Sequence, residues 1–590
     1  MRLPKHEWPN TDGSRGILLF AQLMSEMLTP TTFESFRVYS LDTTSRIFEA
    51  LELLHDVRQE RIPRQVLEPI IEELKWSLKK DPAARNLAGG EIESLLNLLG
   101  TSFSLEDFTS HLRLIQKLVG GHYKKTIELL LLELFDKPDK RMDFRKLVGF
   151  YCCHLINLGY DRNHVRQVLD DSFYSSPVVR MGRKTLEKFL NCFDAKQRRY
   201  IVQAGVTRDL GNYLRGLEFD VHTRLNTGSY AASLTTNSNT ALLPAVFGWS
   251  TVALDPHSAM NSAYQFLSAQ RAISFLDPYG MHCEWGDTMH VTLHRAKSGC
   301  AITKADFLEN KQRPTSPVNK RPQRVTRART ISNYAADIAR NFDGASTERL
   351  LSSIRTAALA RTSFNPENRL ISLWSAIEVL LSEPRDDARI VHYARLVVPC
   401  IVMRHTRRQV IAVYNELLPR YRSRLNTLTR SMETESHGHE AFAELVFLPE
   451  NQQHQAQLCT LLAENPLALH RVFKLQRDYK NVKAVNATID DHADRVRWQI
   501  HRVYRARNQL VHAGRMPTYL ESIILNLAEY YRSAVATIVG RAKREEEASD
   551  IDQIVSEIGI RYGILCNHFR KSKADSPLTQ GDVAKLMGRM

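Results

Sequence analysis

Three residues that could take part in acid–base chemistry or bind an anion stand close together in the last hundred residues of the chain. The stretch VYRARNQLVHAG, residues 503–514, contains Arg507, Asn508 and His512 among apolar residues. An imidazole can take up or release a proton near neutral pH, and a guanidinium can bind a phosphate and the negative charge that develops on it. Asn508 could orient either the imidazole or the phosphate. Together these residue types could transfer a proton and bind an anionic group.

The apolar spacing of residues 498–513 predicts one helix and places Arg507 on its apolar face. Asn508 and His512 are neighbours at i,i+4, whereas Arg507 and His512 should point about 140° apart. Gly514 is expected to end the helix, so that His512 lies in the last turn, where the helix dipole favours a protonated imidazole.

A guanidinium on an apolar face needs a partner, because burying it alone is costly. Glu378, which interrupts the apolar run LWSAIEVLL, is the internal candidate. Two interpretations follow. Arg507 and Glu378 form a structural ion pair with His512 at the end of the helix, or the surface that Arg507 faces is a site for an external ligand.

The run RNQLVH resembles the R-x4–6-H motif of the HEPN superfamily, the higher eukaryote and prokaryote nucleotide-binding domain. Arg507 and His512 match the two motif positions, and Asn508 matches the polar residue that often follows the Arg. The run RLISLWSAIEVLL, followed by several helices and then by VYRARNQLVHAG, is similar to the ApeA-like and related HEPN groups of bacterial defence proteins. The resemblance covers about residues 346–545.

The resemblance implies a helical bundle that usually dimerises, with two such motifs meeting at the interface, and an endoribonuclease that needs neither metal nor cofactor. Arg507, His512 and Asn508 would be its catalytic residues and Glu378 a supporting residue. RNA would be the substrate, with a 2′,3′-cyclic phosphate and a 5′-hydroxyl as products, and DNA would not be cut because it lacks the 2′-hydroxyl. Since the chain shows one clear copy of the motif, a composite site requires a homodimer or a higher oligomer.

The same resemblance implies a biological role as the toxin-like effector of a bacterial antiviral or abortive-infection system. The large remainder of the chain would sense a trigger, such as a phage-derived component, or restrain the nuclease. A second hypothesis is a non-catalytic HEPN module that binds nucleotide or RNA or mediates assembly.

A third hypothesis places a metal-dependent enzyme on a segment that contains Cys283, His290, His294 and Cys300. Zinc accepts these residue types, and His290 and His294 would share one face of a strand. Their spacing matches no zinc pattern, so we expect no metal site. The neighbouring residues Cys152, Cys153 and His154 lie on one expected helix and point in different directions, which favours core packing.

The composition is that of an ordinary globular protein, with 43% hydrophobic and 25% charged residues. The net charge of +15 favours an anionic partner such as nucleic acid, although a basic surface that keeps the protein soluble explains it equally well. Eight cysteines without a C-x-x-C motif and a polar start indicate a reducing, cytoplasmic location. The longest apolar runs are too short to cross a membrane.

Apolar periodicity predicts helices over most of the chain, and short β-branched runs between residues 196 and 310 predict strands. The strand candidates are RRYIVQAGV, LEFDVHTRL, GWSTVALD and MHVTLHRA. SAMNSAYQFLSAQRAISFL is an expected helix among them, and His437 and His439 are expected in an exposed loop. We therefore predict a mainly α, multidomain protein with an N-terminal helical region over residues 1–195, a small central α+β domain over 196–310, a basic linker over 311–345, a HEPN-like helical bundle over 346–545 and a loosely attached helical tail over 546–590.

Overall fold

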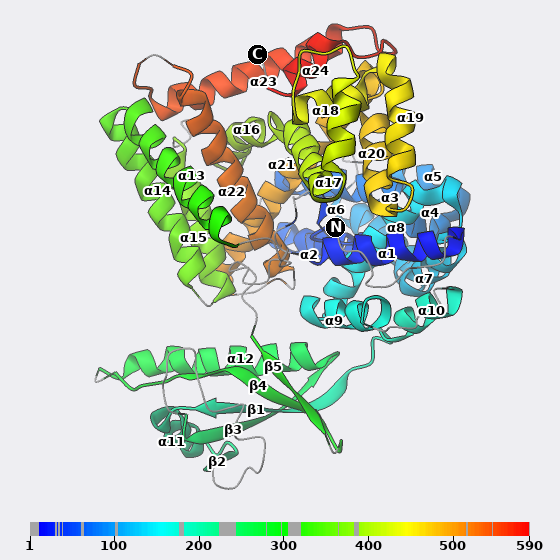
Figure 1. Ribbon diagram of the computed structural model, residues 1–590. Helices are drawn as coiled ribbons and strands as arrows, with labels where there is room; N and C mark the ends of the chain where they lie inside the picture. Colours follow the sequence, from blue (N-terminus) through cyan, green and yellow to red (C-terminus); the bar gives the residue numbers. More distant parts are fainter. Residues whose placement is uncertain are drawn as a thin grey trace. The chain divides into compact units, whose positions relative to one another are not determined.

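The computed structural model describes most of the chain. The described residues are 11–588 except 30, 31, 33–35, 38, 61–63, 101–103, 176–181, 224–242, 279, 297, 305–319, 364, 383–388, 515, 516, 518 and 546. The side chains of residues 65, 320–328, 330 and 513 are not described. The fold is mainly α, with one small antiparallel sheet (Figure 1). None of the described helices is both long enough and apolar enough to cross a membrane.

The chain forms two compact units whose borders differ from the expected domains. The first unit comprises residues 1–153, 181–183 and 311–590, and the second comprises residues 154–180 and 184–310. The N-terminal helices are therefore not a separate domain, because they share a unit with the C-terminal helices. Trp76 donates its indole N–H to Asp491 at 2.8 Å, and Gln22 accepts the backbone N–H of Leu467 at 3.2 Å. Such pairings between distant segments leave no periodic signal in the sequence.

The first unit contains two sets of helices. The N-terminal set is α1 (Asp12–Met27), α2 (Thr43–Arg58), α3 (Leu67–Lys80), α4 (Pro82–Ala88), α5 (Ile92–Leu98), α6 (Leu105–Gly120), α7 (Tyr123–Leu134) and α8 (Arg141–Leu158), the last of which ends in the second unit. The C-terminal set is α13 (Lys320–Asn341), α14 (Gly344–Thr362), α15 (Pro366–Leu380), α16 (Arg389–Val402), α17 (His405–Arg430), α18 (His439–Phe447), α19 (Gln452–Leu461), α20 (Pro466–Asp478), α21 (Val482–Ala513), α22 (Leu520–Ala542), α23 (Ile551–Lys571) and α24 (Gln580–Leu586). Cys152, Cys153 and His154 are buried in α8, as core packing predicts.

The described part of the expected basic linker, residues 320–345, is largely helical. Residues 311–319 lie outside the described part of the chain, but α13 spans Lys320–Asn341 and α14 begins at Gly344. Pro322 is the third residue of α13, where a proline is tolerated because the first turn has no intrahelical partner for its N–H. Pro322 and the basic residues that follow it are therefore compatible with a helix.

The C-terminal tail is part of a hydrophobic core rather than a loose appendix. Phe569 of α23 and Leu586 of α24 are buried in one cluster with residues of α17–α21, among them Val485. Thr579 caps α24 with a capping box, in which it and Asp582 satisfy each other's backbone N–H. The apolar spacing of residues 551–586 thus serves packing against the main body of the first unit.

The second unit is built around a five-stranded antiparallel sheet in the order β2-β3-β1-β4-β5. Its strands are β1 (Arg198–Val206), β2 (Val221–Thr223), β3 (Ala245–Ala253), β4 (Trp285–Leu293) and β5 (Gly299–Thr303). The helices are α11 (Arg208–Gly216) and α12 (Pro256–Ile273), together with α9 (Arg162–Phe173) and α10 (Arg183–Asn191), whose first residue belongs to the other unit. Figure 1 shows α12 running along the sheet. Strand β1 coincides with its predicted run and β2, β3 and β4 overlap theirs, whereas α11 and β5 were not predicted.

One face of this sheet forms the core of the second unit. Val202 of β1 pairs with Trp249 of β3 and with Val291 of β4. These side chains pack with the buried residues of α11 and α12, including Leu210 and Leu267. The alternation of buried and exposed residues along β1 follows from the two-residue period of a strand, which is why its sequence was recognisable.

Candidate functional site

The candidate catalytic residues lie near the C-terminal end of the 32-residue helix α21. Asn481 caps its first turn by accepting the backbone N–H of Ala484 at 2.9 Å. Gly514 ends it with a left-handed backbone conformation, φ 61°, and donates its N–H to the carbonyl of Leu510. A glycine adopts this conformation without steric cost, so the predicted helix end at Gly514 is confirmed.

The buried stripe of α21 passes through Arg502 rather than Arg507. Val496, Gln499, Val503 and Ala506 are all buried, and the Arg502 side chain between them has no exposed surface. Their spacing of three, four and three residues follows one face of the helix. The prediction that Arg507 lies on the apolar face of this helix was therefore wrong, because Arg502 lies there instead.

Arg507 lies at the margin of that face, opposite Glu378. One guanidinium nitrogen, Nη2, is 3.9 Å from Oε2 of Glu378, which is too long for a hydrogen bond, and the two side chains are 25% and 24% exposed. Nη1 donates to Oδ1 of Asn508 at 3.1 Å, while Nε is buried without a hydrogen-bond partner among the described residues. The expected Arg507–Glu378 pair thus exists, but it is loose and half-buried.

Glu378 is held more firmly by another residue. Its Oε1 accepts the indole N–H of the fully buried Trp374 at 2.8 Å, one turn earlier on α15. The Trp374 ring packs at 5.5 Å from the ring of Tyr504 on α21, measured between centroids. Trp374 therefore fixes both the Glu378 carboxylate and the distance between α15 and α21 at the level of Arg507.

His512 is exposed in the last turn of α21. Within the described part of the chain, no side chain or backbone group forms a hydrogen bond or an ion pair with it. Val511 beside it is 48% exposed, so this end of the helix is not covered by the rest of the described chain. The structure joins Arg507 to Asn508 and to Glu378, but it does not bring His512 into contact with Arg507.

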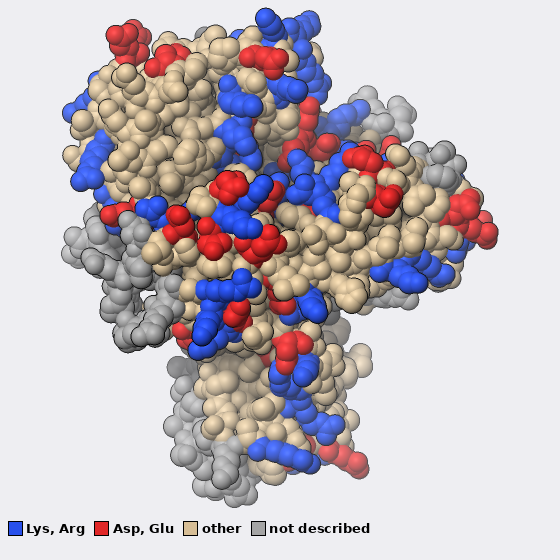
Figure 2. All heavy atoms as spheres, turned by 90° about the vertical axis from the view of Figure 1, so that its right-hand side faces the viewer, with Lys and Arg blue, Asp and Glu red and all other residues tan. Residues whose placement is uncertain are grey.

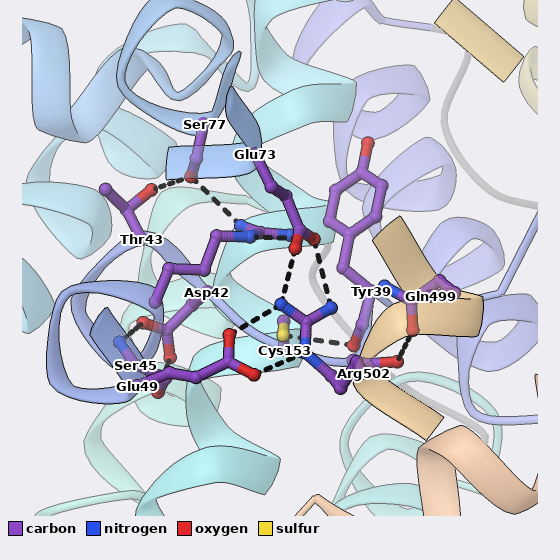
Figure 3. A network of polar contacts seen from close by, with 12 residues as sticks. Tyr39, Asp42, Thr43, Ser45, Glu49, Glu73, Ser77, Cys153, Gln499 and Arg502 are labelled. Atoms are coloured by element: carbon purple, nitrogen blue, oxygen red, sulfur yellow. Dashed lines mark hydrogen bonds and ion pairs between the residues drawn. The ribbon is translucent and has the colours of Figure 1, made fainter. Parts of the chain in front are cut away.

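A buried ionic network that the sequence did not reveal positions this end of α21 (Figure 3). The guanidinium of Arg502 donates to both oxygens of Glu49 on α2, at 3.0 and 2.7 Å, and to Glu73 on α3. Arg505 also donates to Glu49, at 2.7 Å. Arg46 of α2 pairs with Glu73 at 3.2 Å.

The network keeps its members charged in spite of their burial. Burial alone would raise the pKa of the Glu49 carboxyl, but the charges of Arg502 and Arg505 outweigh it and lower the pKa to about 2. The pKa of Glu73 is also lowered, because Arg502 and Arg46 outweigh the effect of burial. Burial disfavours the charged form of Arg502, yet the two carboxylates raise its pKa.

This network extends to the segment that follows His512. Tyr519, beyond the end of α21, donates its hydroxyl hydrogen to Glu49 at 3.5 Å, and its ring lies 5.9 Å from the guanidinium carbon of Arg502. Sequence reasoning could have singled out Glu49 and Glu73, since each stands within an apolar helical run, IFEALELL and IIEELKWSL. Their partner, 453 residues from Glu49, could not be read from the sequence.

The cysteines and histidines of the segment 283–300 do not form one group of side chains. Cys283 is buried in the core of the sheet domain, and His290 is buried in β4. His294 follows the end of β4, and Cys300 is exposed on β5. No group of three or more potential metal-ligating side chains converges anywhere among the described residues.

The two other histidines expected in an exposed loop differ from each other. His437 is exposed, as predicted, whereas His439 is the first residue of α18 and its Nε2 is buried. The charge of the surface is mixed. Figure 2 shows that Lys and Arg are interspersed with Asp and Glu on the face that it presents, so the net charge of +15 does not by itself define a nucleic-acid surface there.

Comparisons of the chain with protein-family models, with curated proteins and with solved structures find no match.

Proposed function

We propose that this protein is a metal-independent endoribonuclease of the HEPN kind, with Arg507, Asn508 and His512 as its catalytic residues. One observation carries the proposal. An exposed imidazole, without a partner among the described residues, stands one turn beyond Asn508 and close in sequence to a guanidinium that is only loosely paired. A purely structural role requires neither an uncommitted imidazole nor a 3.9 Å ion pair.

The reaction needs one proton acceptor and one proton donor. The acceptor removes the proton of the 2′-hydroxyl, the 2′-oxygen forms a bond to phosphorus, and the bond from phosphorus to the 5′-oxygen breaks. The donor protonates that 5′-oxygen, which yields a 2′,3′-cyclic phosphate and a 5′-hydroxyl. Arg507 binds the non-bridging oxygens, and Asn508 holds its guanidinium in place.

A dimer supplies both proton-transfer groups. Arg507 and His512 diverge by about 140° around one helix, which does not suit a pocket within one chain. Two copies of the end of α21 that face each other across a twofold axis place His512 of one protomer near Arg507 of the other. The exposed Val511 next to His512 provides apolar surface for such a contact.

We further propose that the nuclease is the effector of a bacterial antiviral or abortive-infection system. The network of Glu49, Glu73 and Arg502 joins the N-terminal helices to the catalytic end of α21. A trigger that binds the N-terminal helices can therefore act on the site through this connection.

The test is cleavage of a 5′-labelled RNA by the purified full chain in excess EDTA, with the matching DNA strand alongside. We expect RNA cleavage with cyclic-phosphate ends and intact DNA. Replacement of the imidazole in His512→Ala should lower the rate by about 10²–10⁴-fold, the range for loss of a general acid or base. His437→Ala, which removes another exposed imidazole, is the matched control and should cleave like the wild type. Equal rates for both variants contradict the proposal.

A second candidate function is a non-catalytic module that binds RNA or nucleotide. It is favoured by the absence of any contact between Arg507 and His512 within one chain and by the partial engagement of Arg507 with Glu378. This function predicts RNA binding without turnover, weakened by Arg507→Ala and unaffected by His512→Ala. Size-exclusion chromatography with light scattering reports whether a dimer exists to form the composite site.

A further inference from the structure

A carboxylate in α22, Glu529, is shared by two arginines from different parts of the first unit. Arg37, from the segment before α2, and Arg408, from the first turn of α17, both pair with Glu529, the latter at 2.5 Å. Arg37 also donates to the carbonyl of Leu525 at 3.3 Å, and Arg408 donates to Ser533 at 3.2 Å. These contacts bring α17 and α22 together around a single negative charge.

Four more arginines belong to the same region. Arg404 and Arg407 lie within one turn of Arg408 on α17, and Arg532 lies three residues from Glu529 on α22, on the same side of that helix. None of these three side chains pairs with a carboxylate within the described part of the chain. The fourth is Arg361, at the exposed end of α14, which has no such partner there either. We call Arg37, Arg361, Arg404, Arg407, Arg408 and Arg532 the arginine cluster.

The charges of the arginine cluster act on one another. Burial, and after it the charges of Arg408 and Arg407, lowers the pKa of Arg404. Burial lowers the pKa of Arg532, and the charges of Arg37, Arg361 and Arg408 lower it further. The negative charge of Glu529 acts in the opposite direction. For both arginines burial is the largest cause of the lowered pKa, and the charges of the neighbouring arginines act in the same direction.

The backbone adds positive potential at the same place. Arg404 occupies the position before the first turn of α17, and no side chain caps that helix end. A 26-residue helix carries a partial positive charge at its N-terminus, which favours an anion. Planar guanidinium groups match the geometry of phosphate oxygens better than the point charge of a lysine ammonium group does.

We propose that the arginine cluster binds the phosphate groups of a ligand, either a free nucleoside polyphosphate or the backbone of an RNA strand. The site is separate from His512. Arg532 lies twelve residues into α22, about 18 Å along the helix from its first residue, at 1.5 Å per residue. The inference does not rest on the ribonuclease proposal, since binding at this site can be measured without any cleavage.

The experiment uses the full chain and two probes. Inorganic triphosphate represents the free polyphosphate, and a fluorescent 2′-O-methyl RNA 15-mer represents the backbone, because it lacks the hydroxyl needed for cleavage. Affinities are measured by calorimetry and fluorescence anisotropy for the wild type, for the double variant Arg404→Gln/Arg532→Gln and for Arg424→Gln. Arg424 is an exposed arginine of α17, about 30 Å further along the helix, and is the matched control.

We expect at least one probe to bind the wild type, the double variant to bind it at least tenfold more weakly and Arg424→Gln to differ by less than twofold. Binding of the triphosphate alone assigns the site to a free polyphosphate, and binding of the RNA alone assigns it to a backbone. In the absence of a probe, the melting temperature of the double variant should equal or exceed that of the wild type, because the substitutions relieve repulsion. Failure of both probes to bind the wild type, or equal binding by the double variant, overturns the inference.

Discussion

Arg502 of α21 donates to both carboxylate oxygens of Glu49 of α2, with distances of 3.0 Å from Nε to Oε1 and 2.7 Å from Nη2 to Oε2. The two residues are 453 positions apart in the sequence, and both are buried. This bidentate pair holds the helix that carries Arg507 and His512 against the N-terminal helices. The position of the candidate site therefore depends on residues outside the range 346–545.

Replacement of Arg502 by methionine should destabilise the first unit strongly. Arg502→Met leaves Glu49 and Glu73 buried with fewer positive charges, and breaking a buried pair in this way costs about 3–5 kcal/mol. The matched control is Arg497→Met, five residues earlier on α21, whose partner Glu72 is 38% exposed. Such a surface pair is worth about 1 kcal/mol or less. Urea-unfolding midpoints, measured at pH 7.5, should fall clearly for Arg502→Met and little for Arg497→Met.

Removal of the negative charge of Glu378 should strengthen the binding of RNA and change the rate of RNA cleavage little. Glu378→Gln removes a carboxylate 3.9 Å from Arg507, in a half-exposed pair worth about 0.5–1 kcal/mol. We therefore expect KM for RNA to fall by about two- to fivefold and kcat to change little. Glu348→Gln, at an exposed position of α14, should leave both constants unchanged. A loss of kcat as large as that of His512→Ala would instead make Glu378 a catalytic residue.

Stability should decline below pH 6.5 because of buried histidines. The rings of His405 and His492 stack with centroids 3.5 Å apart, and both are buried. Burial, supported by the positive charge of Arg495, lowers the pKa of each well below its ordinary value. Each imidazole is neutral in the folded protein but takes up a proton when unfolded, so its contribution is complete above pH 6.5 and is lost as the pH falls.

Below pH 6.5 the free energy of unfolding should fall by up to about 1.4 kcal/mol per pH unit for each of these two imidazoles. Urea-unfolding midpoints at pH 7.5, 6.0 and 5.0 measure it. The double variant His405→Phe/His492→Phe should show a shallower decline between pH 6.5 and 5, whereas His437→Gln, at an exposed position, should behave like the wild type. An unchanged slope in the double variant would assign the acid sensitivity to other groups.

The C-terminal helices should be required for the stability of the first unit. Phe569 of α23 is fully buried, and Phe569→Ala should cost about 3–5 kcal/mol, because it removes buried apolar surface and leaves a cavity. Ile560 lies on the same helix but is 64% exposed, so Ile560→Ala should change stability by about 0.5 kcal/mol or less. Denaturant titration of the two variants compares them directly. Similar midpoints would mean that α23 is only loosely attached.

Local signals were sufficient where an element is long or strictly periodic. The run RRYIVQAGV is β1 (Arg198–Val206), and SAMNSAYQFLSAQRAISFL lies largely in α12. The five-residue edge strand β5 escaped prediction because Gly299, Cys300 and Ala301 are all exposed and show no alternation. The helix α13 escaped because prolines and basic residues suggested an extended linker.

The sequence by itself determined the features that depend on neighbours a few residues away. These are the helix that ends at Gly514, the place of His512 in its last turn, and the i,i+4 relation of His512 to Asn508. Only the tertiary structure decided which arginine of that helix is buried. Burial depends on what packs against the helix, and Glu49 and Glu73, which neutralise Arg502, come from the opposite end of the chain. A buried charge is stable only where the folded chain places oppositely charged partners beside it. Those partners come from distant parts of the sequence, so no local pattern predicts them.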